Sequence, residues 1–193
     1  MRLILKKIYF FISYLYYKYR YKSFVVMNGF SIIYAHKGAS IHFFSSNEGR
    51  KITINSSEFS NLIGISQRTI ISCRDGGIIN IGPGVGISGS TIYSLSEINI
   101  GKNTIIGSGC KIVDNDFHSL NPELRINQKD SDIKRAPICI GDNCFIGMHS
   151  IILKGTTLGN NCIVGASSVV HGTFPDNVII AGNPAKIIKY IVE

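Results

Sequence analysis

A six-residue repeat that runs from Ile140 to Pro175 constrains this chain more than any other feature. Read in sixes, it is IGDNCF, IGMHSI, ILKGTT, LGNNCI, VGASSV and VHGTFP. Each hexapeptide opens on an aliphatic residue, and its fifth position is small until Phe174. A period of six fits neither an amphipathic helix with about 3.6 residues per turn nor a flat strand with a period of about two. It predicts a three-sided β-solenoid in which each face takes one hexapeptide.

The repeat extends upstream with less regularity. Its opening residues are Ile81 and Ile87 and, after a slip of one residue, Ile100, Ile106 and Ile112. The small fifth positions there are Val85, Thr91, Thr104 and Cys110. Stacked coils turn such residues into a continuous buried ladder. We interpret residues 32–79 as degenerate first coils.

These patterns divide the chain into three parts. Residues 1–30 form a basic and aromatic segment that we expect to be helical. Residues 31–180 form the all-β solenoid, with a polar loop inserted at 119–137 that carries no hexapeptide register. Residues 181–193 form a tail in which we expect a short helix.

The positive charge of the chain is concentrated at its beginning. The first 24 residues contain six basic and no acidic side chains, so the remaining 169 residues hold 14 basic and 12 acidic ones. The longest uncharged stretch there, Ile8 to Tyr17, is shorter than the roughly 20 residues that span a bilayer. No small-residue cleavage site follows, which argues against a signal peptide. Two compatible roles remain open: a peripheral contact with an anionic membrane face, or a cap on the open end of the solenoid.

The five cysteines and the charge balance argue against two classes of protein, disulfide scaffolds and nucleic-acid-binding proteins. Cys110, Cys144 and Cys162 occupy the small fifth position, where a thiol behaves as a small apolar group. This pattern favours a reduced, cytoplasmic protein over a disulfide scaffold. A solenoid body with no concentrated basic face also argues against nucleic-acid binding.

The repeat breaks at VDNDFHSL. If this stretch is extended, Asp114, Asp116 and His118 lie on one side of it. A histidine oriented by a carboxylate is a general-base arrangement. On spacing alone, His118 could equally cap the coil, with the aspartates in turn hydrogen bonds.

DNDFHSL, IGDNCFIGMHSIILKGTTLGNNCIVGASSVV and AGNPAKIIK together resemble the left-handed β-helix acyltransferases of the hexapeptide-repeat type. Within that family, the chain resembles in particular the sugar O-acetyltransferases of surface-polysaccharide and lipopolysaccharide loci. The resemblance covers about residues 78–189. It implies a left-handed parallel β-helix, a homotrimer, acetyl-CoA in the groove between two prisms, and His118 as the base that deprotonates the acceptor hydroxyl for direct attack on the thioester.

The same resemblance places the cofactor. The pantetheine arm would run along corners formed by Met148 and Ala166, and Lys186 and Lys189 would face the phosphates of coenzyme A. His171 and Gly172 stand where relatives usually have threonine and lysine, so one cofactor-facing lysine is missing. Phe145 replaces the tryptophan of many relatives.

We therefore expect an acetyl-CoA-dependent O-acetyltransferase that acts on a sugar hydroxyl of a cell-surface glycan or its precursor. Asn115 and Arg125 are candidates for acceptor binding. An N-acetyltransferase of an amino-sugar nucleotide is the nearest alternative, and a non-catalytic scaffold is the second. Some left-handed β-helices are zinc carbonic anhydrases, which need three histidines that converge across a subunit interface. The five histidines here include no closely spaced pair in the regular coils, so we expect no metal.

Overall fold

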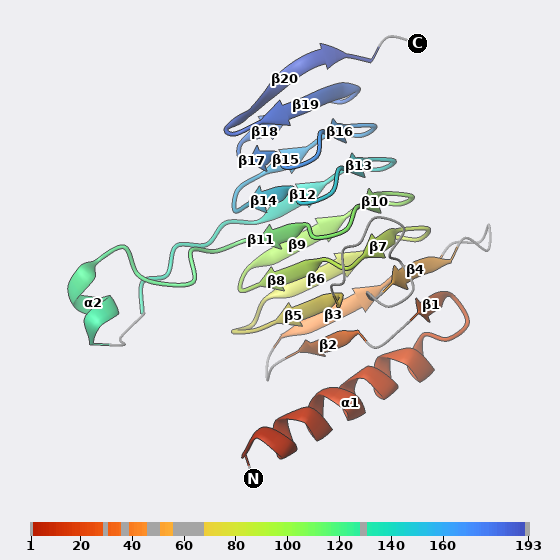
Figure 1. Cartoon of the computed structure of the whole chain (residues 1–193), viewed down its shortest axis with the longest axis vertical. Helices are drawn as coiled ribbons and strands as arrows, with labels where there is room; N and C mark the ends of the chain where they lie inside the picture. Colours follow the sequence, from red (N-terminus) through yellow and green to blue (C-terminus); the bar gives the residue numbers. More distant parts are fainter. Residues whose placement is uncertain are drawn as a thin grey trace.

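The computed structural model describes residues 2–28, 31–35, 39–45, 51–55, 68–127 and 131–191. These residues wind into a left-handed parallel β-helix, a three-sided prism with helix α1 (Arg2–Arg20) across its N-terminal end (Figure 1). The predicted fold class is confirmed. A polar arm that carries the short helix α2 (Pro122–Ile126) projects from one corner of the prism.

The strands of the described residues form three sheets, one for each face of the prism. Sheet A has the spatial order β1 (Val25–Asn28), β4 (Ile52–Asn55), β7 (Gly86–Ser88), β10 (Ile105–Ile106), β13 (Phe145–Ile146), β16 (Ile163–Val164), β19 (Val178–Gly182) and β20 (Ala185–Tyr190). Sheet B has the order β17 (Val169–Val170), β14 (Ile151–Leu153), β11 (Lys111–Val113), β8 (Thr91–Ser94), β5 (Ile70–Cys73) and β2 (Ile32–Ala35). Sheet C has the order β18 (Thr173–Phe174), β15 (Thr157–Leu158), β12 (Ile138–Ile140), β9 (Glu97–Ile100), β6 (Ile78–Ile81) and β3 (Ser40–Phe43).

Inward aliphatic side chains stack through the whole prism. Along sheet B the fully buried ladder is Ile33, Ile71, Ile92, Ile112 and Ile152. At about 25 cal/mol per Å² of buried apolar surface, such ladders supply the main stabilising free energy. The predicted small positions at Cys144, Ser150, Thr156, Cys162 and Ser168 are also buried, with at most 1% exposure.

Two positions of the predicted repeat are shifted. Thr91 points outward and is half-buried, because the corner from Ile87 to Ile92 is one residue shorter than the corner stacked on it, and Ser90 takes the inward position. Ser90 donates a hydrogen bond to the carbonyl oxygen of Gly107 at 2.7 Å. Phe174 was predicted to occupy the fifth position of its hexapeptide, but it does not. It pairs with Leu158, because the last coil is shortened and its corner residues stack 16 instead of 18 positions apart.

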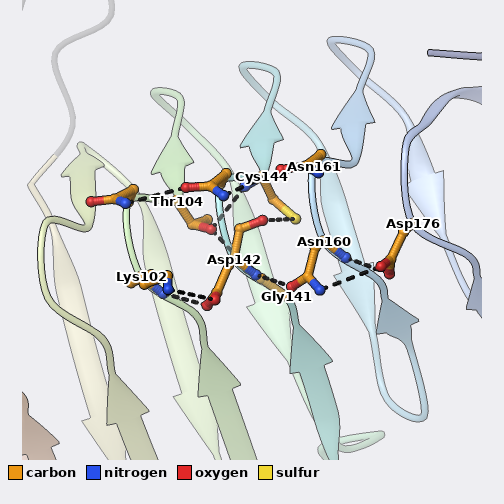
Figure 2. Close-up of polar contacts among 10 residues, drawn as sticks. Lys102, Thr104, Gly141, Asp142, Cys144, Asn160, Asn161 and Asp176 are labelled. Carbon is orange, nitrogen blue, oxygen red and sulfur yellow. Dashed lines mark hydrogen bonds and ion pairs between the residues drawn. The ribbon is translucent and has the colours of Figure 1, made fainter. Parts of the chain in front are cut away.

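The corner between sheets C and A is fixed by a ladder of asparagines, part of which is drawn in Figure 2. Asn103, Asn143, Asn161 and Asn177 all adopt a left-handed backbone, with φ between 55° and 59°. Each side-chain amide donates to the next side-chain oxygen, at 3.2, 3.2 and 2.7 Å. Asparagine tolerates positive φ better than other non-glycine residues, so this residue type satisfies the backbone and the ladder together.

A second polar row lies beside the asparagines (Figure 2). The Asp142 carboxylate accepts from the backbone N–H of Lys102 at 2.9 Å, and Asn160 Oδ1 accepts from the N–H of Asp142 at 2.8 Å. Asp176 accepts in the same way from Asn160 at 2.8 Å. These bonds satisfy corner N–H groups that the parallel sheets leave unpaired.

Helix α1 covers the apolar end of the prism. Tyr14 and Tyr17 are buried, and Ser13 donates to the carbonyl oxygen of Ile33 at 2.5 Å. Tyr17 packs edge-on against Phe43, with ring centroids 6.1 Å apart. Helix α1 therefore caps the prism. The predicted N-terminal segment, residues 1–30, also contains β1, the first strand of sheet A. No helix in the described part of the chain is both long and apolar enough to cross a bilayer.

The predicted C-terminal helix is wrong. Residues 185–190 form β20, which pairs antiparallel with β19. The physical reason is that β19 would otherwise end sheet A with unpaired backbone groups, and a returning strand covers that edge. Gly182, with φ of 106°, lies in the reversal between the two strands.

Candidate active site

The arm leaves the prism at the corner between sheets B and C, after β11, and returns to β12. Its two chains pair antiparallel at a short neck, where Asn115 bridges Arg135. The N–H of Asp116 donates to the carbonyl oxygen of Lys134, and the N–H of Ala136 donates to that of Asp114, both at 3.0 Å. The neck holds the DNDFHS segment at a defined place on the prism.

Asp114 lies inside the prism, with no exposed surface. Its carboxylate accepts hydrogen bonds from Ser94 Oγ at 2.6 Å and from the backbone N–H groups of Leu95 and Ser96, both at 2.9 Å. A buried carboxylate needs such donors, because burial without them is very costly. Asp114 therefore anchors the neck to the preceding coil. These partners were not predicted from the sequence, although the serines that flank Leu95 were an available signal.

The segment from Asp114 to His118 is not extended, so the prediction that its three side chains share one side is wrong. Phe117 has φ of 62°, and the N–H of His118 donates to the carbonyl oxygen of Asp116 at 2.7 Å, which closes a γ-turn. Such turns are rare and strained. Asn115 Oδ1 supports this turn by accepting from the N–H of Phe117 at 2.9 Å. The turn places His118 on the surface, where it is exposed.

Asp116 forms an ion pair with Lys154, which follows β14 on the next coil. The two side chains are 22% and 32% exposed, so the pair is largely shielded from solvent. Partial shielding strengthens a charge pair relative to one on the open surface. The ion pair of Lys154 was not predicted from the sequence, although Lys154 is the single lysine within the regular repeats from Ile140 to Pro175.

The two residues predicted to bind the acceptor are both held by the arm itself. The Asn115 amide is buried and donates to Asp114 at 3.0 Å, besides supporting the turn. Arg125, on α2, donates from Nη1 to the carbonyl oxygens of Ser119 and Leu120, at 2.7 and 2.8 Å. Both residues therefore shape the arm.

Exposed aromatic surface lies next to His118. The Phe117 ring is 48% exposed and lies against Tyr93 of β8, with ring centroids 5.0 Å apart and an interplanar angle of 38°. Burial raises the pKa of Tyr93, while the nearby charge of Arg74 opposes that shift. Phe117 and Tyr93 form what we call the aromatic shelf.

A groove of about 500 Å³ lies along sheet A, on a different part of the prism. It is lined by Ser88, Ile105, Ile106, Gly107, Ser108, Phe145, Gly147, Met148, Ile163, Val164, Gly165 and Ala166. Met148 and Ala166, predicted to follow the pantetheine arm, are both in it. Gly147 is needed for this close stacking, because a Cβ there would come within 2.5 Å of the Ala166 nitrogen.

The other predicted cofactor residues lie outside that lining. Lys186 and Lys189 are exposed on β20, at the C-terminal end of the same sheet. His171 and Gly172 lie in the corner between β17 and β18, which is the corner that carries the arm two strands earlier in sheet B. Within one chain, His118 is thus separate from the groove that contains Met148 and Ala166.

The described residues contain no cluster of three or more histidine, cysteine or acidic side chains that could hold a metal. His36, one of the five histidines, lies outside the described residues. The cysteines are free thiols, and all except the half-buried Cys139 are buried. Burial raises the pKa of Cys73 to about 11, and a hydrogen bond with Cys162 together with burial raises the pKa of Cys144.

Residues 137–171 match the family described as the hexapeptide repeat of succinyl-transferase. The comparisons bear out the resemblance stated from the sequence, because this match is to a hexapeptide-repeat family and the relatives of the chain include acetyltransferases.

Particular relatives narrow the comparison. Protein CapG of Staphylococcus aureus is 48% identical over 99 residues, which are 49% of this chain and 53% of CapG. The putative lipopolysaccharide biosynthesis O-acetyl transferase WbbJ of Escherichia coli is 35% identical over 105 residues, covering 51% of this chain and 53% of WbbJ. The first three curated relatives are matched over 33%, 53% and 59% of their own lengths, so the chain spans at most about three-fifths of each.

Solved structures agree on the fold. A galactoside acetyltransferase in complex with coenzyme A is 26% identical, with a TM-score of 0.51 over 80% of this chain and 66% of that one. The N-acyltransferase AntD of Bacillus cereus is 24% identical, with a TM-score of 0.57 over 91% and 87%. At that identity, AntD bears on the fold alone.

Proposed function

We propose that the protein is an acetyl-CoA-dependent O-acetyltransferase that acetylates a sugar hydroxyl of a cell-surface glycan or its precursor. The observation that carries this proposal is the γ-turn that exposes His118 beside the aromatic shelf. The matches to a lipopolysaccharide O-acetyl transferase and to a coenzyme A-bound galactoside acetyltransferase support the choice of donor and acceptor. Buried free thiols favour a reduced, cytoplasmic setting.

His118 is the proposed general base. Its imidazole removes the proton of the acceptor hydroxyl while the oxygen attacks the thioester carbonyl carbon of acetyl-CoA. The carbon–sulfur bond then breaks, and the imidazolium returns the proton to the departing thiolate. A base placed in this way contributes about 10² to 10⁴ in rate. Asp114 and Asn115 act as positioning residues, because they hold the turn and do not reach the surface.

The groove along sheet A is the proposed donor site. Its glycines and Ala166 allow the backbone of two stacked corners to approach an extended pantetheine arm closely. Lys186 and Lys189 are suitable point-charge partners for the phosphates of coenzyme A. We propose no metal, since a neutral histidine base and a thioester donor need none.

We further propose a homotrimer. His118 and the groove occupy different parts of one prism, so a single chain does not bring the base to the donor. A neighbouring prism that places its groove against the corner of His118 and His171 completes the site. The prediction follows that monomeric protein is inactive even when it is folded.

The aromatic shelf is the proposed acceptor surface. A sugar ring presents C–H groups on one face, and an exposed aromatic ring offers an apolar surface that suits such a face. An acceptor stacked on Phe117 brings a hydroxyl to the adjacent His118.

An N-acetyltransferase of an amino-sugar nucleotide is the alternative on the same fold. An amine with an appreciable neutral fraction needs a base less than a hydroxyl does, so a dependence on His118 favours O-acetylation. A non-catalytic scaffold, the second alternative, predicts no thiol release with any acceptor.

Thiol release from acetyl-CoA, measured over a panel of glycans and amino-sugar nucleotides, tests the proposal. We expect His118→Ala to lower turnover by about a hundredfold or more with donor affinity unchanged. His42→Ala is the matched control, because His42 is an exposed histidine on β3 of the first coil. A His118→Ala variant that keeps more than half the activity would exclude His118 as the base.

A further inference from the structure

We propose that the outward face of α1 is a docking surface for an anionic lipid bilayer. The face is a stripe of exposed apolar and aromatic residues with spacings of three or four, which places them on one side of a helix. We call it the outward stripe, and its members are Leu5, Ile8, Ile12, Tyr16 and Tyr19, which are 48% to 65% exposed.

The opposite side of the same helix is occupied. Ser13, Tyr14 and Tyr17 face the prism, and the described strands all lie on that side of α1 (Figure 1). The cap therefore accounts for one side of α1 and leaves the outward stripe unexplained. A run of large exposed apolar residues of this kind marks an interaction surface.

The basic residues around the outward stripe indicate that its partner is anionic. Lys7, Lys18, Arg20 and Lys22 are exposed along the helix and just after it. Arg20 lies over the Tyr16 ring, with its guanidinium 5.5 Å from the ring centroid, and so sits at the edge of the stripe. The sequence contains no acidic residue before Glu48. An apolar stripe with basic edges is the pattern of a helix that lies in the interface of an anionic membrane.

A cavity at the side of α1 also combines basic and apolar side chains. It has a volume of about 660 Å³ and is lined by Lys7, Phe10, Phe11, Ile32 and Arg68. Two cationic side chains over an aromatic and aliphatic lining suit a phosphate headgroup with the first carbons of an acyl chain. The cavity lies between α1 and the first coils, and it adds the basic side chain of Arg68 to those of the helix.

Docking through the outward stripe fixes the distance between the lipid surface and the proposed active site. Sheet B places β2 next to α1 and β11, which leads into the arm, three strands further along. At about 4.8 Å per strand, this puts the His118 corner about 14 Å above the first coil. Adding about 10 Å for the helix gives about 25 Å above the lipid surface. An acceptor sugar attached to a membrane lipid would lie within that range.

The test is co-sedimentation of the full chain with vesicles of phosphatidylglycerol and phosphatidylcholine in equal parts, compared with phosphatidylcholine alone. We expect binding to the anionic vesicles only, and weaker binding as salt rises. Lys7→Gln with Lys22→Gln should lower the partition coefficient about fivefold per charge. Ile8→Gln, Ile12→Gln and Tyr16→Gln together should lower it about tenfold or more.

Matched variants on other parts of the chain control for charge and hydropathy. Lys102→Gln with Lys134→Gln removes the same charge from exposed sites on the body, and Ile188→Gln with Tyr190→Gln removes equally exposed apolar surface from the opposite end of the prism. Both should bind like the unmodified protein.

Three results would overturn the proposal. The first is equal binding to neutral and anionic vesicles, and the second is unchanged binding of the stripe variant. The third is a stripe variant whose assembly has a lower mass than that of the unmodified protein, since the stripe would then be a contact between copies of the chain. Vesicle binding needs neither acceptor nor acetyl-CoA, so its failure is distinguishable from failure of the proposed activity.

Discussion

The side-chain amide of Asn115 donates to the buried carboxylate of Asp114 at 3.0 Å and accepts, through its oxygen, from the backbone of Phe117 at 2.9 Å. One asparagine thus connects the interior of the prism to the turn that presents His118. The coil formed by Ser94 to Ser96 fixes Asp114, Asp114 fixes Asn115, and Asn115 fixes the turn.

Asn115→Ala should therefore affect the turn without removing any group from the surface. We expect the catalytic constant to fall about tenfold with little change in the Michaelis constant for acetyl-CoA, and stability to fall by about 1 to 2 kcal/mol. Asn99→Ala is the control, because Asn99 also makes side-chain amide hydrogen bonds but lies on sheet C, away from the arm. Equal losses of activity in the two variants would show a general stability effect.

Phe117 allows its ring and its backbone to be tested separately. Phe117→Gly removes the ring but relieves the strain of a positive φ, whereas Phe117→Ala removes the ring and keeps that strain. We expect both variants to raise the Michaelis constant for the acceptor several-fold, and the glycine variant to be the more stable by about 1 kcal/mol. Steady-state kinetics with a soluble acceptor and thermal unfolding measure the two effects. If neither variant changes acceptor affinity, the aromatic shelf does not bind the sugar.

Lys186 and Lys189 are predicted to hold the phosphates of coenzyme A. Their joint replacement by alanine should raise the Michaelis constant for acetyl-CoA several-fold with a smaller effect on the catalytic constant, because the phosphates are remote from the thioester. A donor that lacks the 3′-phosphate provides the comparison. A mutation that weakens both donors equally would show that these lysines do not bind that phosphate.

The asparagine ladder predicts a stability effect far from the site. Asn161→Ala removes two side-chain hydrogen bonds and places alanine at φ of 57°, so we expect a loss of about 2 kcal/mol. Asn161→Gly loses the same hydrogen bonds without the backbone strain and should be about 1 kcal/mol less destabilised. Denaturant unfolding measures both variants. Equal stability of the two would mean that backbone strain makes no contribution at this corner.

The inward ladder could be predicted from the sequence because the aliphatic and small residues within each hexapeptide mark its buried positions. It could not locate features that depend on contacts between coils. Ser90 takes the inward position predicted for Thr91 because the corner between Ile87 and Ile92 is one residue short, and only the stacking of coils shows where a corner loses a residue. β20 formed because the edge of β19 needed a partner, which no local helix propensity reveals. The turn at Phe117 depends on Asn115, Asp114 and the distant Ser94, and the ion pair of Asp116 depends on Lys154, 38 residues away.

Cys73 predicts how stability changes in alkali. Its thiol is fully buried in sheet B, and burial raises its pKa from an ordinary value of 9.0 to about 11. The folded state therefore keeps a proton that the unfolded state loses, so the stabilising contribution is complete below pH 9 and is lost as the pH rises to about 11. This difference corresponds to about 2 to 3 kcal/mol. The measurement is the free energy of unfolding at several pH values between 9 and 11, for which Cys73→Ala should show a shallower decline than the unmodified protein. Cys139→Ala, at a half-buried cysteine on the outer face of sheet C, serves as the control and should decline like the unmodified protein. An identical decline in all three proteins would show that Cys73 does not set the alkaline limit, and that other buried groups such as Tyr17 do.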